Sequence, residues 1–225
     1  MTCIMRSPAA LVTGLVLAII ILPCIGCGGV GKTPEDIFER AKTSAEAKDY
    51  KTYADCFTPE TQDGLAGAMI LSSVVLFELK NMPELPEMPN MPGAAQVPDF
   101  EAMLAAVPDI EATLESHNVA IDDLPQGGGL LAMLGGGGTK TEVDAIVDGI
   151  VNKPAFIGDM MAVLSVVEPE GQGVASLFSG DLTEVVINED QATGKITNLP
   201  NDAEVPIEFH KTSDGWRLHL PMMAL

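Results

Sequence analysis

The feature that most constrains this chain is an uninterrupted apolar segment close to its N-terminus. The segment runs from Leu11 to Leu22, carries no charged residue and is followed by Pro23, and Arg6 is the one charged residue before it. Its 12 residues are too few to cross a bilayer as a helix, which takes about 20, but they match the hydrophobic region of a secretion signal. We therefore expect residues 1–26 to be a signal peptide and the rest to fold outside the cytoplasm.

The residues after Pro23, Cys24-Ile25-Gly26-Cys27, resemble the lipobox of bacterial lipoprotein precursors. In that family a small residue precedes the cysteine, which receives a diacylglyceryl group before the signal is cleaved. Ile25 and Gly26 match the pattern, and Cys24 stands where leucine is usual. The resemblance implies cleavage after Gly26, a lipid on Cys27 that anchors the chain to a membrane, and a location in the bacterial cell envelope, at the outer membrane or the periplasmic face. Ordinary secretion and an uncleaved anchor are the alternatives.

Residues 26–33 also satisfy the pattern G-x-x-x-x-G-K-[ST] of phosphate-binding loops. Such a loop needs a buried parallel strand before it and a helix after it within a βαβ unit. Here a signal segment precedes the motif, and cleavage after Gly26 would divide it. We interpret residues 27–33 instead as a flexible glycine-rich tether that leads to a single folded domain over residues 34–225.

The chain is strongly acidic, with 32 acidic residues against 12 basic ones and a formal net charge of −20. A surface of this charge repels nucleic acid, so we exclude nucleic-acid binding. The nearest candidate for a calcium-binding loop, residues 188–194, has Ala192 where an oxygen ligand is required. Aromatic residues make up only 4% of the chain, which predicts an aliphatic core.

Four cysteines are present, namely Cys3, Cys24, Cys27 and Cys56. Cys3 and Cys24 would leave with the signal and Cys27 would carry the lipid, so Cys56 would have no partner for a disulfide. We therefore predict that Cys56 is a small, buried, apolar residue.

Local signals predict three helices at the start of the domain. Thr33-Pro34 and Thr58-Pro59 each combine a capping residue with a proline suited to the first helical turn. Residues 50–57, between these two starts, have helical apolar spacing, and the third helix is expected to run to about Leu79. Residues 64–77 of this helix carry no charge, which indicates a core helix.

The middle of the domain, residues 82–140, is predicted to be a largely helical insertion rich in proline and glycine. Prolines recur at every third residue from Pro83 to Pro92, which is the period of polyproline II and predicts an extended strut over residues 82–92. The spacing of Met88 and Met91 would also suit copper(I), but the proline period explains it without a metal.

A duplicated motif and a glycine-rich loop follow in the middle segment, and two predicted helices come after them. A duplicated Val-Pro-Asp-x-Glu-Ala motif at residues 97–102 and 107–112 predicts two short helices begun by proline. Residues 127–138 form a glycine-rich loop around an apolar pentapeptide, which we expect to pack on the core; a membrane or partner hook is the alternative. Apolar residues at helical spacing predict helices over 143–150 and 156–167.

From Val174 onward the pattern changes to strands and turns. Alternating apolar and polar residues predict strands over 182–187, 192–198, 205–209 and 216–220. Pro206 indicates an edge or a bulge. In the last hairpin we take residues 211–215 as the loop and expect Glu208 and Arg217 as neighbours on the outer face. N-terminal helices packed on a C-terminal antiparallel sheet of about four strands define an α+β fold.

The closing sequence Val-x-Ile-x-Phe-His-Lys-Thr-Ser-Asp-Gly-Trp-Arg-Leu, after three N-terminal helices, is similar to the NTF2-like (SnoaL-like) superfamily. Residues 33–79 and 182–220 carry the resemblance, whereas the helical middle replaces strands that are usual in the family. The resemblance implies either a non-catalytic binding or assembly module, or an isomerase or dehydratase with Asp and His in a cone-shaped pocket.

Candidate chemical residues are few. We expect His117, beside Ser116 at a helix end, to be solvated. His210 and His219 can lie close together on the outer face of the hairpin, but we find no cluster of His, Cys or carboxylates with metal-ligand spacing. The motifs H-E-x-x-H and G-x-S-x-G are both absent from the sequence. The sequence thus predicts no catalytic residue, no metal and no cofactor.

Three functional hypotheses follow. The first is a non-catalytic, lipid-anchored protein outside the cytoplasm that binds an envelope protein or a small ligand. The second is an NTF2-like enzyme acting on a small hydrophobic substrate, which requires a cavity between the long helix and the sheet. The third is a purely structural surface lipoprotein.

Overall fold

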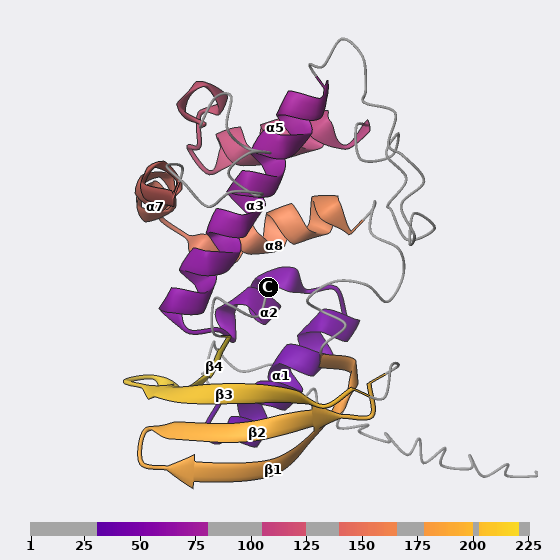
Figure 1. The fold of residues 1–225 in the computed structure, drawn as a ribbon, viewed down its shortest axis with the longest axis vertical. Coiled ribbons are helices and arrows are strands. Elements are labelled where there is room, and N and C mark those ends of the chain that lie inside the picture. Colours follow the sequence, from indigo (N-terminus) through magenta and orange to yellow (C-terminus); the bar gives the residue numbers. More distant parts are fainter. Residues whose placement is uncertain (1–30, 81–104, 125–139, 166–177, 200–202, 221–225) are drawn as a thin grey trace, which may run out of the picture.

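The computed structural model describes residues 31–80, 105–124, 140–165, 178–199 and 203–220 (Figure 1). Gly26 and Cys27, the strut over residues 82–92 and the glycine-rich loop over residues 127–138 lie outside this part of the chain. Within it, helices come first and an antiparallel sheet comes last, which confirms the predicted α+β fold. None of the described helices is both long and apolar enough to span a bilayer.

Capping signals start the first three helices where the sequence predicts them. These helices are α1 (Pro34–Glu46), α2 (Tyr50–Asp55) and α3 (Pro59–Lys80). At α1, Thr33 Oγ1 accepts from the Asp36 N–H and the Asp36 carboxylate accepts from the Thr33 N–H, both at 3.2 Å. At α3, Thr58 Oγ1 accepts from the Thr61 N–H at 3.3 Å. Local sequence therefore sets these helix starts.

The sheet is a meander in which each strand pairs with the next, in the order β1-β2-β3-β4. The strands are β1 (Asp181–Asn188), β2 (Gln191–Thr197), β3 (Val205–Thr212) and β4 (Gly215–His219). β3 is an inner strand of the sheet, in which Pro206 pairs with Lys195 of β2, and the described part of β4 ends opposite Glu208. β1 is irregular between Thr183 and Val186, where Glu184 adopts a φ of 53°.

The final hairpin has a shorter loop and a different register from those predicted. Three pairs define the register: Glu208 with His219, His210 with Arg217, and Thr212 with Gly215. The turn is therefore only two residues long, which is the loop length that best matches the twist of paired strands. Glu208 and Arg217 are consequently diagonal neighbours on the same face of the hairpin, as expected, and are not directly opposed.

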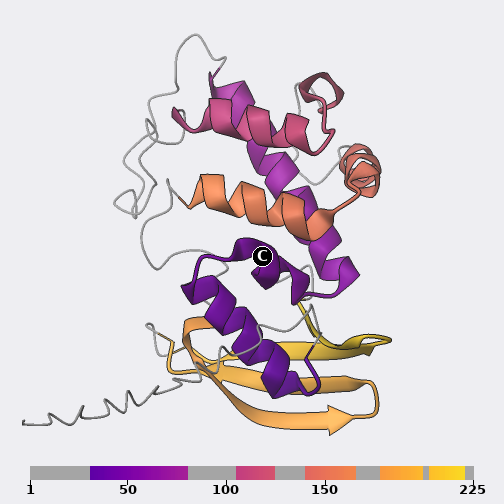
Figure 2. The ribbon, with the colours of Figure 1, turned by 180° about the vertical axis from the view of Figure 1, so that it is seen from behind.

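The helices extend away from one edge of the sheet. Figures 1 and 2 show α1 against the sheet and α2 between α1 and α8, with all the other helices on the β4 side and β1 farthest from them. The outer helices are α5 (Val107–Ser116), α7 (Lys140–Gly149) and α8 (Lys153–Leu164), and a 3-10 turn follows α5 at Ile121–Asp123. They pack on α3, which runs away from the sheet and joins this second layer.

The core is mainly aliphatic by number, but aromatic residues supply most of its largest side chains, which the composition did not predict. Phe38, Tyr53, Phe57 and Phe178 are almost completely buried where α1 and α2 meet the sheet. Their ring centroids lie 5.0–5.9 Å apart, mostly in edge-to-face arrangements. The few aromatic residues are thus concentrated at the junction of helices and sheet.

The second edge of β4 is also paired, although not with a strand. The Trp216 N–H donates to the Gly31 carbonyl at 2.9 Å, and the Leu218 N–H donates to the Cys56 carbonyl at 2.9 Å. The Thr58 N–H in turn donates to the Leu218 carbonyl at 2.8 Å. β4 is therefore held between β3 and two N-terminal segments, Gly31 ahead of α1 and the connection between α2 and α3.

Candidate functional site

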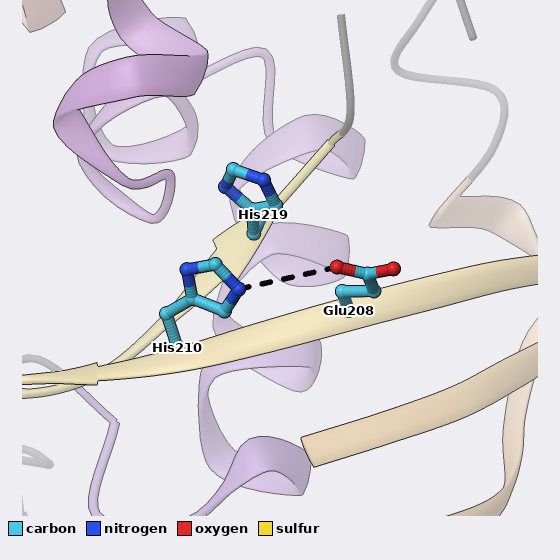
Figure 3. Close-up of side chains that lie close together, drawn as sticks. All are labelled: Glu208, His210 and His219. Atoms are coloured by element: carbon cyan, nitrogen blue, oxygen red, sulfur yellow. Dashed lines mark ion pairs between the residues drawn. The ribbon is translucent and has the colours of Figure 1, made fainter. Parts of the chain in front are cut away.

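The hairpin brings three side chains with metal-ligating atoms onto one face of the sheet. Glu208 and His210 are two residues apart on β3 and therefore point to the same side, opposite to the buried Ile207 and Phe209. The two-residue turn places His219 of β4 directly opposite Glu208. Figure 3 shows the three side chains gathered at this point.

The three side chains are close enough to act together. The rings of His210 and His219 are stacked, with centroids 4.1 Å apart and planes inclined by 14°. His210 Nε2 lies 3.9 Å from Glu208 Oε2 (Figure 3). One potential ligand atom from each residue lies within 4.8 Å of the other two. The side chains of Glu208 and His210 are 50% and 32% exposed, so solutes can reach the cluster from solvent.

A buried threonine holds His219 in place. His219 Nδ1 lies 3.1 Å from Thr58 Oγ1, and the Thr58 hydroxyl donates to Thr61 Oγ1 at 3.1 Å. Thr61 Oγ1 accepts from the Leu220 N–H at 3.0 Å and donates to the Leu220 carbonyl at 3.5 Å. Each hydroxyl has a single proton, so when Thr58 donates to Thr61 its Oγ1 accepts from His219. In that arrangement Nδ1 of His219 carries the proton and the Nε2 lone pair is free.

The environment favours the neutral form of His210. Partial burial lowers the pKa of His210, the neighbouring His219 lowers it further, and Glu208 and Glu60 oppose the shift. At neutral pH the His210 imidazole is therefore uncharged and has a lone pair available for bonding.

A positive charge, Arg217, lies opposite His210 in the register. Its guanidinium donates to the Asp55 carbonyl and to the Phe57 carbonyl, the latter at 3.3 Å, and its Nη1 lies 3.6 Å from Asp55 Oδ1. Arg40 Nη2 also lies 3.2 Å from Asp55 Oδ2. Arg217 therefore ties β4 to the connection between α2 and α3, and part of its charge is balanced by Asp55.

The histidine predictions are corrected in two respects. The expectation of no ligand cluster was wrong, because Glu208, His210 and His219 converge. The 208–210 spacing and a two-residue turn between Thr212 and Gly215 are the sequence signal that would have revealed it.

His117 is not solvated either. Its side chain is only 13% exposed, its Nε2 lies 2.9 Å from Asp159 Oδ2, and its ring packs edge-on against Phe156. The α5–α8 contact, invisible in local sequence, covers it.

The prediction for Cys56 is confirmed. Cys56 is a free cysteine with no exposed surface, and its Sγ donates to the Thr52 carbonyl at 3.3 Å. Burial is the main cause that raises the pKa of its thiol from 9.0 to about 12.

We expect Cys56 to resist alkylation in the native protein. A pKa of about 12 in place of 9.0 leaves about 1000-fold less thiolate, and burial blocks access to what remains. Iodoacetamide labelling at mildly alkaline pH, followed by peptide mass spectrometry, should label Cys56 only after unfolding in urea. Rapid labelling of Cys56 in the folded protein would contradict this assignment.

The described residues show no dry acid or base of the kind an enzyme pocket needs. Among them, every Asp, Glu and His side chain is at least partly exposed. A shallow depression does lie beside the turn after α5, lined by residues that include Asn118, Val119 and Asp122, but both polar members of that set are exposed. No family model, curated protein or solved structure matches the chain, so its function is argued from its own residues.

Proposed function

We propose that this chain is a lipid-anchored, non-catalytic protein of the bacterial cell envelope, at the outer membrane or the periplasmic face, whose α+β domain binds a partner protein or a small ligand. The apolar segment Leu11–Leu22 and the lipobox-like residues before Cys27 support export and anchoring. The formal net charge of −20 suits a role that does not involve nucleic acid.

The observation that carries the proposal is the position of Gly31. Its carbonyl accepts from the Trp216 N–H, and a Cβ at this position would lie 2.6 Å from the Ile37 backbone nitrogen, so only glycine fits. Gly31 follows Cys27 by four residues, which span at most about 14 Å when fully extended. A lipid on Cys27 would therefore hold the β4 edge of the domain close to the membrane surface.

The NTF2-like relationship is part of the proposal as a binding module rather than as an enzyme. In its support, α1 packs against an antiparallel sheet that ends in the quoted hairpin. The enzyme alternative requires a cavity between the long helix and the sheet. α3 instead runs into the second helical layer, and buried aromatic rings from α1, α2 and the segment before β1 pack against one another beside the sheet. These features favour binding over catalysis.

The test of the anchor is membrane fractionation of the expressed precursor beside the Cys27→Ala variant. We expect the wild type to lose residues 1–26, to gain the mass of a lipid and to sediment with membranes until detergent is added. Cys27→Ala should lack the lipid mass and, because lipidation precedes cleavage, should keep residues 1–26. Conversion of the buried Cys56 to alanine is the matched control and should leave lipid attachment unchanged.

Two outcomes would contradict the proposal. If wild type and Cys27→Ala are cleaved at the same place and are both freely soluble, Cys27 is only a residue of the tether. If both keep the N-terminal segment and stay in the membrane, the apolar segment is an uncleaved anchor.

A further inference from the structure

We infer that Glu208, His210 and His219 form a binding site for a divalent transition-metal cation, for which Zn²⁺ is the best match. The inference goes beyond the proposed anchoring and binding role, because it concerns only the hairpin and requires neither the lipid nor a membrane. The one feature it uses is the convergence of two imidazoles and one carboxylate on the same face of β3 and β4.

The donor atoms select the class of cation. Imidazole nitrogen suits zinc and the other late first-row metals, and carboxylate oxygen also binds zinc. Calcium and magnesium prefer sets made of oxygen alone, which this cluster does not offer. Three protein ligands leave a fourth tetrahedral position free, and the exposure of Glu208 and His210 makes that position accessible to water or to a further ligand.

The separation of the ligand atoms is within reach of a zinc geometry. Zinc–ligand distances of about 2.0–2.2 Å place tetrahedral ligand atoms about 3.4 Å apart. The atoms in the cluster lie within 4.8 Å of one another, and His210 Nε2 is 3.9 Å from Glu208 Oε2. Binding therefore needs rotation of the Glu208 and His210 side chains, which turns the His210 ring out of the stack while His219 keeps its contact with Thr58. The backbone can stay as it is, because the register already places the three residues side by side.

The strongest support is the orientation of His219. Its Nδ1 lies 3.1 Å from Thr58 Oγ1, and Thr58 is itself 1% exposed and hydrogen-bonded to Thr61. Metal-binding histidines usually donate their second ring nitrogen to such a partner, which sets the tautomer and aims the other nitrogen at the metal. The connection between α2 and α3 thus already supplies the second hydrogen bond that a ligating His219 would need.

The surrounding charge also favours a cation. Glu60, at the start of α3, is close enough to act on His210 electrostatically, and the chain as a whole has a formal net charge of −20. Arg217, the positive charge directly opposite His210, is engaged by Asp55 and by two backbone carbonyls. Its guanidinium is thereby held toward the α2–α3 connection.

The test is titration of the purified full chain, in detergent, with Zn²⁺ by isothermal calorimetry in the presence of excess Mg²⁺. We expect one saturable site per chain. His210→Ala and His219→Ala should each weaken binding by at least about 100-fold, since each removes a ligand, and Glu208→Gln should weaken it by about 10-fold or more. His117→Gln is the control, because it removes a histidine at the α5–α8 contact and should leave zinc affinity unchanged.

A second readout identifies the ligands directly and guards against misfolded variants. NMR of the wild type should show the imidazole resonances of His210 and His219 shifting on Zn²⁺ addition, while those of His117 stay in place. The inference is overturned if the wild type binds Zn²⁺ no more tightly than the double variant His210→Ala/His219→Ala. It is also overturned if Mg²⁺ displaces Zn²⁺, because that result would indicate binding to a general acidic surface. Failure of the membrane fractionation test would not alter these titrations.

Discussion

Replacing Phe178 with alanine is expected to lower the free energy of unfolding by about 3–5 kcal/mol. Phe178 is 1% exposed and contacts the rings of Phe38, Tyr53 and Phe57, with centroids 5.6, 5.5 and 5.9 Å away. Truncation removes the shared member of all three contacts and leaves a cavity that the rings on α1, α2 and the α2–α3 connection cannot easily fill. The loss should therefore be among the largest that a single substitution can cause in this domain.

Urea denaturation followed by the fluorescence of Trp216 measures this loss, because Trp216 is the one tryptophan of the chain and is 5% exposed. Val151→Ala is the matched control, since Val151 is 94% exposed and its truncation should change stability by less than about 0.5 kcal/mol. A loss below about 1.5 kcal/mol for Phe178→Ala would mean that the aromatic cluster is not the centre of the core.

The substitution Gly158→Ala should destabilise the domain by about 1–3 kcal/mol, although alanine is a better helix former than glycine. Gly158 lies in α8, and a Cβ there would be 2.7 Å from the backbone nitrogen of Lys51 in α2. Backbone atoms cannot rotate away as a side chain would, so α8 and α2 must separate. This contact joins the helices on the sheet to the outer helical layer.

The matched control is Gly67→Ala in α3, where the new Cβ would meet Val143 Cγ1 at 3.5 Å, an ordinary contact. That change should stabilise the protein by up to about 1 kcal/mol through helix propensity. The two glycine variants are thus expected to have opposite signs in the same denaturation experiment. Equal effects at the two positions would show that α2 and α8 are not in close backbone contact.

At the candidate site, the sequence predicted the hairpin but not its register. Alternation along β3 and the turn residues predicted the hairpin and placed both histidines on its outer face. The assumed loop of five residues hid the pairing of Glu208 with His219, and with it the ligand cluster. A strand register depends on the turn length, and an error of one pair moves every cross-strand neighbour.

Residues close together in the sequence were thus sufficient to predict several local features of this protein. Thr33 and Thr58 start helices because their hydroxyls bond to backbone N–H groups within three residues. The length of Leu11–Leu22 predicts a signal in the same local way. Only the tertiary structure decided the features that join distant segments: Gly31 and Cys56 on the far edge of β4, the cover over His117, and Thr58 behind His219. Such contacts depend on which elements pack together, and apolar periodicity marks the buried face of an element without identifying its partner.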